Sequence, residues 1–501
     1  MNPELPAEPI AQKEVNIRQA IMQGGLWIFF ARWSMRGIGI VSTVILARLL
    51  APEDFGLVAI CLLLVGLAET IGKEGQNLAV IRRQNLDREY VDSAWTASII
   101  TGVVLGIIVV SLAPLFAKYF NEPRAIVLIY ILSVRVFIMG FQNIGNALNR
   151  KNFNFGKDFL FNFLEKIIPS VFTIIAAYYL RNYWALVFGA ILGYAGAIIA
   201  SYMLFDYRPR ICFKHIVEVW SFSIWVVAEK FAFFSTMRID QFFVPAVGNA
   251  TELGHYHVGS ELARMPVVEL FMPIDRVLVP AYARLLSEPK ELANTYLHTL
   301  AVAIIICLPV SIGFAMVASD AVQLIYGANW IPMIPVVELI AISSFAVAII
   351  STITPVLQVL GKSRMSAALI YLQALLLLGG LLIFQARFEN IDDIAWVRLA
   401  AAMLTLPVAL ICVRNMIMIR YIEMLKVFWR PAIAVSVMIL VLLFVLPQDM
   451  ETPILVRLIL RIAAGGLAYA SSLMLLWLVA GKPPGAERAL SRLVTERLGS
   501  N

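Results

Sequence analysis

The sequence predicts an all-α polytopic membrane protein with about fourteen transmembrane helices. Of its 501 residues, 60% are hydrophobic and only 15% are charged. The mean hydropathy is +0.83, and a soluble chain of this length could not hide so much apolar surface. Apolar segments also recur along the whole chain, each close to the roughly 20 residues that a helix needs to cross a bilayer. The bilayer is therefore expected to be part of the solvent of this protein.

Fourteen segments meet the length criterion, with ends that can shift by several residues. They lie near residues 24–48, 55–72, 92–116, 124–148, 158–180, 183–205, 219–245, 253–280, 295–318, 334–358, 366–386, 392–413, 429–446 and 454–480. The first is too long and too rich in arginine for a cleavable signal peptide, so we expect it to remain as a membrane anchor. The seventh and eighth carry many polar groups and are the weakest candidates.

The connections between these spans differ in charge from one side of the membrane to the other. With the N-terminus inside, the inner connections hold about 23 Lys and Arg residues and the outer connections about 5. Positive charge concentrates on the cytoplasmic side, so both termini are predicted to be cytoplasmic. The longest polar stretches are the first 20 residues, residues 73–92 and the last 20 residues, and no soluble domain of substantial size is expected.

A faint internal repeat relates the two halves of the chain. The stretch "LARLLAPEDFGLVAI" returns as "FVPAVGNATELGHYHVG", which aligns Phe55-Gly56 with Leu253-Gly254. Both copies run from inside to outside, so the repeat is parallel and predicts two lobes of six helices with the substrate path between them. The expected divisions are a cytoplasmic segment 1–23, an N-lobe 24–205, a cytoplasmic loop 206–218, a C-lobe 219–416, a closing helix pair 417–480 and a basic cytoplasmic tail 481–501.

Charged residues inside the spans are the candidate functional residues. Arg32 and Arg36 are four residues apart, so they share one helix face. Two like charges on one face are tolerated in a membrane where that face meets water, acids or an anionic ligand. Arginine suits pyrophosphate because its planar fork donates paired hydrogen bonds to phosphate oxygens. The alternative is that the side chains reach the inner surface or pair with acids for structural reasons.

Other intramembrane charges extend this set. Arg135 lies in a span that holds no acid, which favours a role in a cavity. Lys230 follows Glu229, and adjacent residues on a helix point in different directions. This pair either joins neighbouring helices or faces the cavity and titrates during transport. Glu261 and Arg264 are three residues apart and are expected to pair, whereas Arg398 is expected to reach the outer surface.

The stretches "ARLLAPEDFGLVAI", "IDQFFVPAVGNATELGHYHVG" and "LVPAYARLLSEPKEL" resemble the polysaccharide-transport branch of the MOP (multidrug/oligosaccharidyl-lipid/polysaccharide) superfamily, the Wzx-type oligosaccharide flippases. The resemblance covers essentially the whole chain. It implies a V-shaped bundle of two lobes in the bacterial inner membrane. It also implies a substrate made of a sugar repeat unit on undecaprenyl pyrophosphate.

The lipid II flippases of the same superfamily use cationic residues of helices 1, 2 and 8 at the cavity. Here the first span supplies Arg32 and Arg36, and the eighth supplies Arg264. The second span has no Arg or Lys and carries only Glu69 near its inner end. This departure favours a lipid-linked glycan other than lipid II.

These observations together predict a flippase that works by alternating access in exopolysaccharide, capsule or O-antigen synthesis. The residues expected to bind pyrophosphate or line the cavity are Arg32, Arg36, Arg135, Lys230 and Arg264. The acids expected to couple transport to H⁺ or Na⁺ are Glu69, Glu229, Asp240 and Glu261. The membrane potential, about 2.3 kcal/mol per charge per 100 mV, is one source of free energy for such coupling.

The sequence holds no constellation that indicates an enzyme, a bound cofactor or a metal site. We expect a monomer that contacts its lipid-linked substrate, membrane lipids and the polysaccharide polymerase or export machinery, with no nucleic acid partner. The alternative function is a MATE-like, cation-coupled exporter of small molecules. Such an exporter would need net acidic charge in its cavity, and the intramembrane arginines disfavour it.

Overall fold

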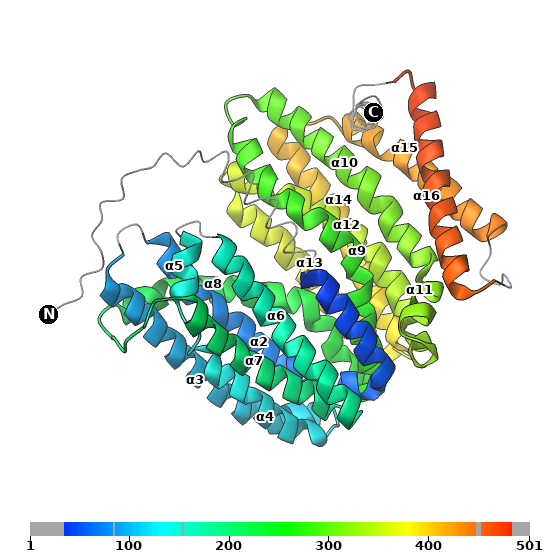
Figure 1. Ribbon diagram of the computed structural model, residues 1–501. Helices are drawn as coiled ribbons and strands as arrows, with labels where there is room; N and C mark the ends of the chain where they lie inside the picture. Colours follow the sequence, from blue (N-terminus) through cyan, green and yellow to red (C-terminus); the bar gives the residue numbers. More distant parts are fainter. Residues whose placement is uncertain (1–34, 84–85, 152–154, 447–451, 483–501) are drawn as a thin grey trace, which may run out of the picture. The chain divides into compact units, whose positions relative to one another are not determined.

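The computed structural model describes residues 35–83, 86–151, 155–446 and 452–482 (Figure 1). Within these ranges the chain is almost entirely helical and has no strand, which confirms the all-α class. Residues 35–49 are helical as well. The following elements are α2 Pro52–Arg82, α3 Arg88–Tyr119, α4 Arg124–Met139, α5 Gly145–Lys151, α6 Phe155–Leu180, α7 Trp184–Leu204, α8 Ile216–Arg238, η1 Ile239–Ala246, α9 Ala250–Ala283, α10 Pro289–Met316, α11 Ala318–Ile325, η2 Ala328–Met333, α12 Ile334–Val359, α13 Ser363–Phe384, η3 Gln385–Arg387, α14 Ile391–Ile417, α15 Tyr421–Leu440, η4 Val441–Val445 and α16 Ile454–Val479.

The predicted spans can be compared with these helices. Every span from the second onward falls on a helix, but only ten described helices are long and apolar enough to cross a membrane. The fourth, seventh and eighth spans fall on α4, α8 and α9, which lie outside those ten. The count of fourteen is therefore not confirmed. Most of the first span lies outside the described residues.

The connection between α2 and α3 is shorter than predicted. We expected a polar stretch over residues 73–92, but α2 continues to Arg82 and α3 begins at Arg88. The reason is that Ala79 and Val80 continue the buried face of α2 and pack with Tyr90 of α3 in one apolar cluster. Burial of this face extends the helix through residues whose polarity alone suggests a loop.

The chain forms two compact units that do not follow the order of the sequence. Unit 1 contains residues 1–49, 68–111 and 130–227, and unit 2 contains residues 50–67, 112–129 and 228–501. Residues 52–67 of α2, 112–119 of α3 and 124–129 of α4 therefore belong to the same unit as α9 to α16. The division into lobes at residues 205 and 219 stays a prediction.

Unit 1 contains the closely packed pair α6 and α7. Gly189 and Gly193 of α7 face Thr173 and Pro169 of α6, and a Cβ atom on Gly189 would lie 1.8 Å from the hydroxyl oxygen of Thr173. Small residues four apart let helix backbones approach in a membrane, where packing replaces the hydrophobic driving force.

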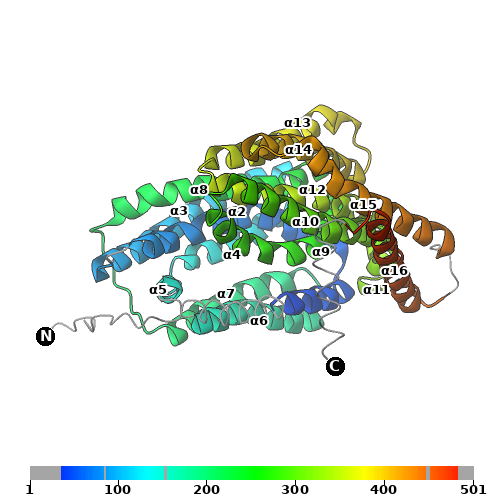
Figure 2. The ribbon, with the colours of Figure 1, turned by 90° about the horizontal axis from the view of Figure 1, so that it is seen from above.

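Unit 2 is built around α12, which packs against α9, α10 and α14 (Figure 2). Helices α15 and α16 pack against each other and against α10, and the Tyr469 hydroxyl donates to the Ile305 carbonyl at 2.8 Å. Asp320 of α11 is fully buried between Arg457 and Arg461 of α16, with N–O distances of 2.7 and 2.8 Å. We call these three residues the Asp320 cluster. It attaches α16 to the rest of unit 2.

Candidate functional site

A group of polar and charged side chains around a buried aspartate lies where α8 ends, within unit 2. We call it the Asp240 cluster and define it as Arg238, Asp240, Tyr256, His257, Glu261, Arg264 and Arg398. Asp240 at its centre is fully buried. One of its carboxylate oxygens accepts a hydrogen bond from Arg398 at 2.5 Å and another from the Tyr256 hydroxyl at 2.7 Å. Arg264 lies 3.9 Å from the same oxygen.

The end of α8 explains why arginines gather there. The last carbonyls of a helix have no partner inside the helix and carry partial negative charge. Arg398 donates to the Thr236 carbonyl at 3.1 Å, and Arg264 donates to the Met237 carbonyl at 3.2 Å. Each guanidinium thus joins the helix terminus to Asp240, the second residue of the following 3-10 helix η1.

A second layer surrounds this centre. Arg238 pairs with Glu261 of α9 at 2.9 Å, and its guanidinium lies 3.1 Å from the His257 ring. Glu261, which was expected to pair with Arg264, forms an ion pair with Arg238. The cluster therefore holds three arginines against two acids, a formal excess of one positive charge.

This excess charge has a geometric counterpart at Arg264. Its Nη2 atom is buried and has no hydrogen-bond partner among the described residues. The side chain as a whole is 16% exposed. A buried charge that is not fully paired costs several kcal/mol unless an anion or water satisfies it. The arrangement is suited to accept an oxygen of an anionic ligand.

Asp240 and Glu261, two of the predicted coupling acids, lie in this cluster with Arg264. Both oxygens of Asp240 already accept hydrogen bonds, because the second one receives the backbone N–H of Gln241 at 3.1 Å. A proton or Na⁺ ion at Asp240 would compete with Arg398 and Arg264 for the charge of this carboxylate. The geometry therefore favours a structural and electrostatic role for this carboxylate.

The structure brings two other predicted residues together in unit 1. Arg135 of α4 pairs with Glu69 of α2 at 3.0 Å, and their side chains are 16% and 15% exposed. The Arg135 guanidinium also lies 5.4 Å from the centre of the Tyr194 ring on α7. The span of Arg135 holds no acid, but the neighbouring helix supplies one. This pair is neutral, unlike the Asp240 cluster.

The remaining predicted residues are described in part. Arg32 lies outside the described residues, and the side chain of Glu229 is not described. Arg36 and Lys230 are half-buried. Near Arg36, the side chain of Lys166 from α6 lies against Gly39, where an added Cβ atom would be 3.4 Å from its Cε atom. The lysine therefore lies against the same face of the first span as Arg36, about one helical turn further along the chain.

Sequence reasoning missed Arg398. We expected it to reach the outer membrane surface, but its residue is 8% exposed and its guanidinium binds Asp240. The prediction was wrong because it compared the depth of Arg398 only with the ends of its own helix. The signal that could have found the pair is Asp240 itself, since a buried intramembrane acid requires a cationic partner. Arg238 and Tyr256 were missed for the same reason.

The two glycines that the repeat aligns also meet in unit 2. A Cβ atom on Gly56 would lie 1.6 Å from the Ala250 carbonyl oxygen, and one on Gly254 would lie 2.0 Å from the Pro52 carbonyl oxygen. The first turns of α2 and α9 thus cross at backbone contact, and we call this contact the glycine crossing. Phe55 packs edge-on against the buried Trp330 beside it, with ring centres 5.3 Å apart.

Comparison with known proteins adds to this description. The family described as "Polysaccharide biosynthesis protein" matches residues 45–335. The lipopolysaccharide biosynthesis protein WzxC of Escherichia coli (strain K12) is 25% identical over 336 residues, 66% of this chain and 68% of WzxC. The succinoglycan biosynthesis transport protein ExoT of Rhizobium meliloti (strain 1021) is 22% identical over 338 residues, 67% of this chain and 68% of ExoT. A solved structure of the lipid II flippase MurJ, inward closed conformation, superposes with a TM-score of 0.73 at 13% identity and covers 90% of this chain and 99% of that chain, which shows a shared fold.

Proposed function

The chain belongs to the polysaccharide biosynthesis protein family, and from this premise we propose that it is a flippase for lipid-linked oligosaccharides. It moves undecaprenyl-pyrophosphate-linked repeat units across the bacterial inner membrane by alternating access. The repeat units serve exopolysaccharide, capsule or O-antigen synthesis. Both termini lie in the cytoplasm, and the polymerase or export machinery receives the product.

The excess positive charge of the Asp240 cluster carries this proposal. Pyrophosphate is a compact dianion whose oxygens match the donor geometry of guanidinium groups. Arg264 keeps a buried Nη2 atom with no hydrogen-bond partner among the described residues, and Arg398 and Tyr256 hold Asp240 against it. The aspartate keeps the arginine oriented without neutralising the cluster. A pyrophosphate oxygen at Arg264 completes the charge balance.

The glycine crossing supplies the element that must open and close. Alternating access requires contact at one end of the substrate path that forms in one state and separates in the other. Gly56 and Gly254 allow two helix termini to meet at backbone distance, which side chains would prevent. We assign this contact to the closure of the outer side, at the predicted outer end of the first repeat.

The decisive experiment uses a deletion strain and a complementing plasmid. Loss of the chain should cause undecaprenyl-linked repeat units to accumulate on the inner leaflet, and the wild-type gene should reverse this. Arg264→Ala should fail to complement, and Arg264→Lys should restore part of the activity because it keeps the charge but loses the planar fork. Arg36→Ala should also fail.

Arg284→Ala is the matched control, because Arg284 follows α9 at its C-terminal end and is exposed. It should complement fully. All variants are compared at equal protein levels in the membrane fraction. Full complementation by Arg264→Ala would contradict the role of the cluster, and absence of accumulation in the deletion strain would contradict the flippase function itself.

The same strains separate the alternative of a MATE-like exporter. A cation exporter should change the accumulation of a dye such as ethidium, and the change should disappear on deletion. The flippase function predicts no change in ethidium accumulation. The positive charge around Arg264 favours the flippase, because it repels a cationic substrate.

Ion coupling is proposed for acids other than Asp240. Glu69 and Glu261 each hold an ion pair that protonation would release, and Glu229 adjoins Lys230. Flipping in proteoliposomes should then depend on an imposed H⁺ or Na⁺ gradient. Equal rates with and without both gradients would reject coupling and leave the flippase proposal intact.

A further inference from the structure

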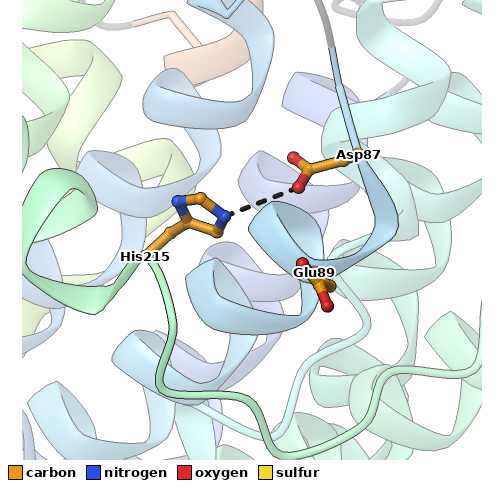
Figure 3. Close-up of side chains that lie close together, drawn as sticks. All are labelled: Asp87, Glu89 and His215. Atoms are coloured by element: carbon orange, nitrogen blue, oxygen red, sulfur yellow. Dashed lines mark ion pairs between the residues drawn. The ribbon is translucent and has the colours of Figure 1, made fainter.

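Three side chains with metal-binding atoms lie together within unit 1, outside the site described above (Figure 3). Asp87 is in the connection between α2 and α3, Glu89 is in the first turn of α3, and His215 directly precedes α8. One atom from each side chain lies within 4.8 Å of the other two. The sequence conceals this group because its members come from two connections far apart in the chain.

The His215 ring is oriented by its surroundings. Its backbone N–H donates to the Ser93 hydroxyl at 3.2 Å, and its ring packs beside Tyr90 with centres 5.7 Å apart. Its Nδ1 atom lies 3.4 Å from a carboxylate oxygen of Glu218. That oxygen is fixed in turn by Arg83, which binds the same carboxylate at 2.7 and 2.8 Å.

This orientation determines what the other ring nitrogen can do. With the proton on Nδ1 facing Glu218, the Nε2 atom carries a lone pair. Nε2 is buried, lacks a hydrogen-bond partner among the described residues, and lies 3.5 Å from an oxygen of Asp87. Two lone pairs that face each other at this distance repel unless a proton or a metal ion lies between them. A carboxylate behind a histidine that faces a metal is a recurrent arrangement in metal sites.

We propose that Asp87, Glu89 and His215 form a binding site for a divalent transition-metal ion such as Mn²⁺ or Zn²⁺. One imidazole nitrogen and two carboxylate oxygens suit such ions, which bind these atoms at about 2.0–2.2 Å. Ligands around a tetrahedral ion are then separated by roughly 3.4 Å, close to the 3.5 Å between Nε2 and Asp87. The carboxylates of Asp87 and Glu89 are about half exposed, so they can close on the ion and leave its other positions to water.

Lys214 is the natural competitor for this ion. Its ammonium group pairs with Glu89, which raises the pKa of Lys214 above its ordinary value. The site therefore already attracts positive charge, but a flexible, exposed ammonium is a weaker partner than a divalent ion. Replacing Lys214 with methionine should tighten metal binding, an effect that an ordinary surface ion pair would not predict.

The position of the site indicates its consequence. Two side chains of α3 accept hydrogen bonds from the backbone of the segment before α8. The backbone N–H of Arg210 donates to the Asp92 carboxylate at 2.9 Å, and the backbone N–H of Cys212 donates to the Thr96 hydroxyl at 2.9 Å. His215 is the last point of this attachment. A metal ion there cross-links the start of α8 to the connection between α2 and α3, and should stabilise unit 1 by mass action.

The test uses the full chain, purified in detergent and freed of metal by a chelator. Titration with Mn²⁺ followed by electron paramagnetic resonance, and with Zn²⁺ by calorimetry, should give one ion per chain. His215→Ala and Asp87→Asn should each weaken binding at least ~10-fold, and Glu218→Gln about 10-fold. Lys214→Met should strengthen it, and Mn²⁺ should raise the melting temperature of the wild type but not of His215→Ala.

Matched controls are His298→Ala, Asp206→Asn and Lys157→Met, which alter exposed residues elsewhere. They should bind Mn²⁺ as the wild type does, and all variants should keep the wild-type elution volume and helical circular dichroism. Retained Mn²⁺ and Zn²⁺ binding in His215→Ala would overturn the proposal. So would the absence of Mn²⁺ and Zn²⁺ binding by the wild type. Neither readout depends on transport, so this result is separate from that of the flippase experiment.

Discussion

Unit 2 buries two aspartates, and each is flanked by two arginines in a different way. In the Asp320 cluster, one oxygen binds Arg457 at 2.7 Å and the other binds Arg461 at 2.8 Å. In the Asp240 cluster, a single oxygen binds Arg398 at 2.5 Å, and Arg264 stands 3.9 Å away. The same residue types thus form one pairing in which each carboxylate oxygen binds its own arginine, and one in which a terminal nitrogen of the second arginine has no hydrogen-bond partner among the described residues.

The surroundings explain the difference. Arg461 is fully buried and uses its second terminal nitrogen on the Met316 carbonyl at 3.0 Å, so this guanidinium acts as a fastener for α16. Arg264 is partly exposed and adjoins Glu261 and Arg238, which add further charge. Both terminal nitrogens of Arg461 have partners within unit 2 and only its Nε atom has none, whereas Arg264 keeps a terminal nitrogen without a hydrogen bond among the described residues. A terminal nitrogen in a partly exposed side chain can reach a ligand, so we assign this role to Arg264. We therefore expect substitutions at Asp320 to lower stability and substitutions at Arg264 to lower transport.

The largest effect on stability is expected at Asp320. Asp320→Asn leaves two arginines of α16 without their counter-charge, and breaking a buried ion pair in this way costs about 3–5 kcal/mol. The melting temperature in detergent should fall strongly, and less protein should reach the membrane. The exposed substitution Asp206→Asn serves as the control. A melting temperature equal to the wild type would show that the Asp320 cluster does not fasten α16.

Arg264→Ala should lower the rate of flipping more than it lowers the stability of the protein. Removal of a hydrogen bond to a charged ligand costs about 1.5–3 kcal/mol of binding, which corresponds to a loss of roughly 10–100-fold in the rate of flipping at low substrate concentration. The loss of stability should be smaller than for Asp320→Asn, because Arg264 donates to the Met237 carbonyl but its Nη2 atom makes no hydrogen bond among the described residues. The measurement is flipping in proteoliposomes together with the melting temperature. A large fall in the melting temperature with an unchanged rate of flipping would show that Arg264, like Arg461, has a structural role.

Substitutions in the Arg135–Glu69 pair of unit 1 should lower stability less than Asp320→Asn does. Each single substitution, Arg135→Met or Glu69→Gln, leaves a partly buried charge or amide without its partner and should destabilise the chain by about 1–3 kcal/mol. The double substitution should cost less than the sum, because it removes both partners. A double-mutant cycle on the free energy of unfolding measures the coupling. Additive effects would contradict a direct interaction between the two side chains.

The smallest effect belongs to the pair of Glu122 and Arg124 in the connection before α4. Hydrogen bonds from Arg124 hold the pKa of Glu122 below its ordinary value of 4.5. The stabilisation is therefore present above about pH 4.5 and is lost as pH falls through the lower, folded-state value. Because Arg124 is 46% exposed, Glu122→Gln should cost only about 0.2–1 kcal/mol at pH 7. This difference between variant and wild type should shrink as the pH falls below 4.5, and a difference that grows on acidification would refute the assignment.

The sequence predicted individual site residues better than it predicted their partners. Arg264, Asp240 and Glu69 were recognised because a charge inside an apolar span is visible in the chain itself. The acids Asp240, Glu69 and Glu261 pair with arginines of other helices, and nothing in the local periodicity specifies which helices become neighbours. These arginines are Arg398, Arg135 and Arg238 respectively. Arg398 was assigned to the membrane surface for this reason, although Asp240 required a cation.

The positions of the helices followed from local physics. Apolar length sets where a chain can cross a bilayer, and backbone hydrogen bonds must then be satisfied within the segment, so α6 and α14 lie close to their predicted limits. The repeat also identified Gly56 and Gly254, because a close backbone contact restricts the residue type in the chain. Long-range pairing decided the rest: the charge balance around Asp240, the fastening of α16, and the meeting of His215 with Asp87 and Glu89. These contacts join residues far apart in the chain, and only the packing of one helix against another brings their charges within a few ångströms.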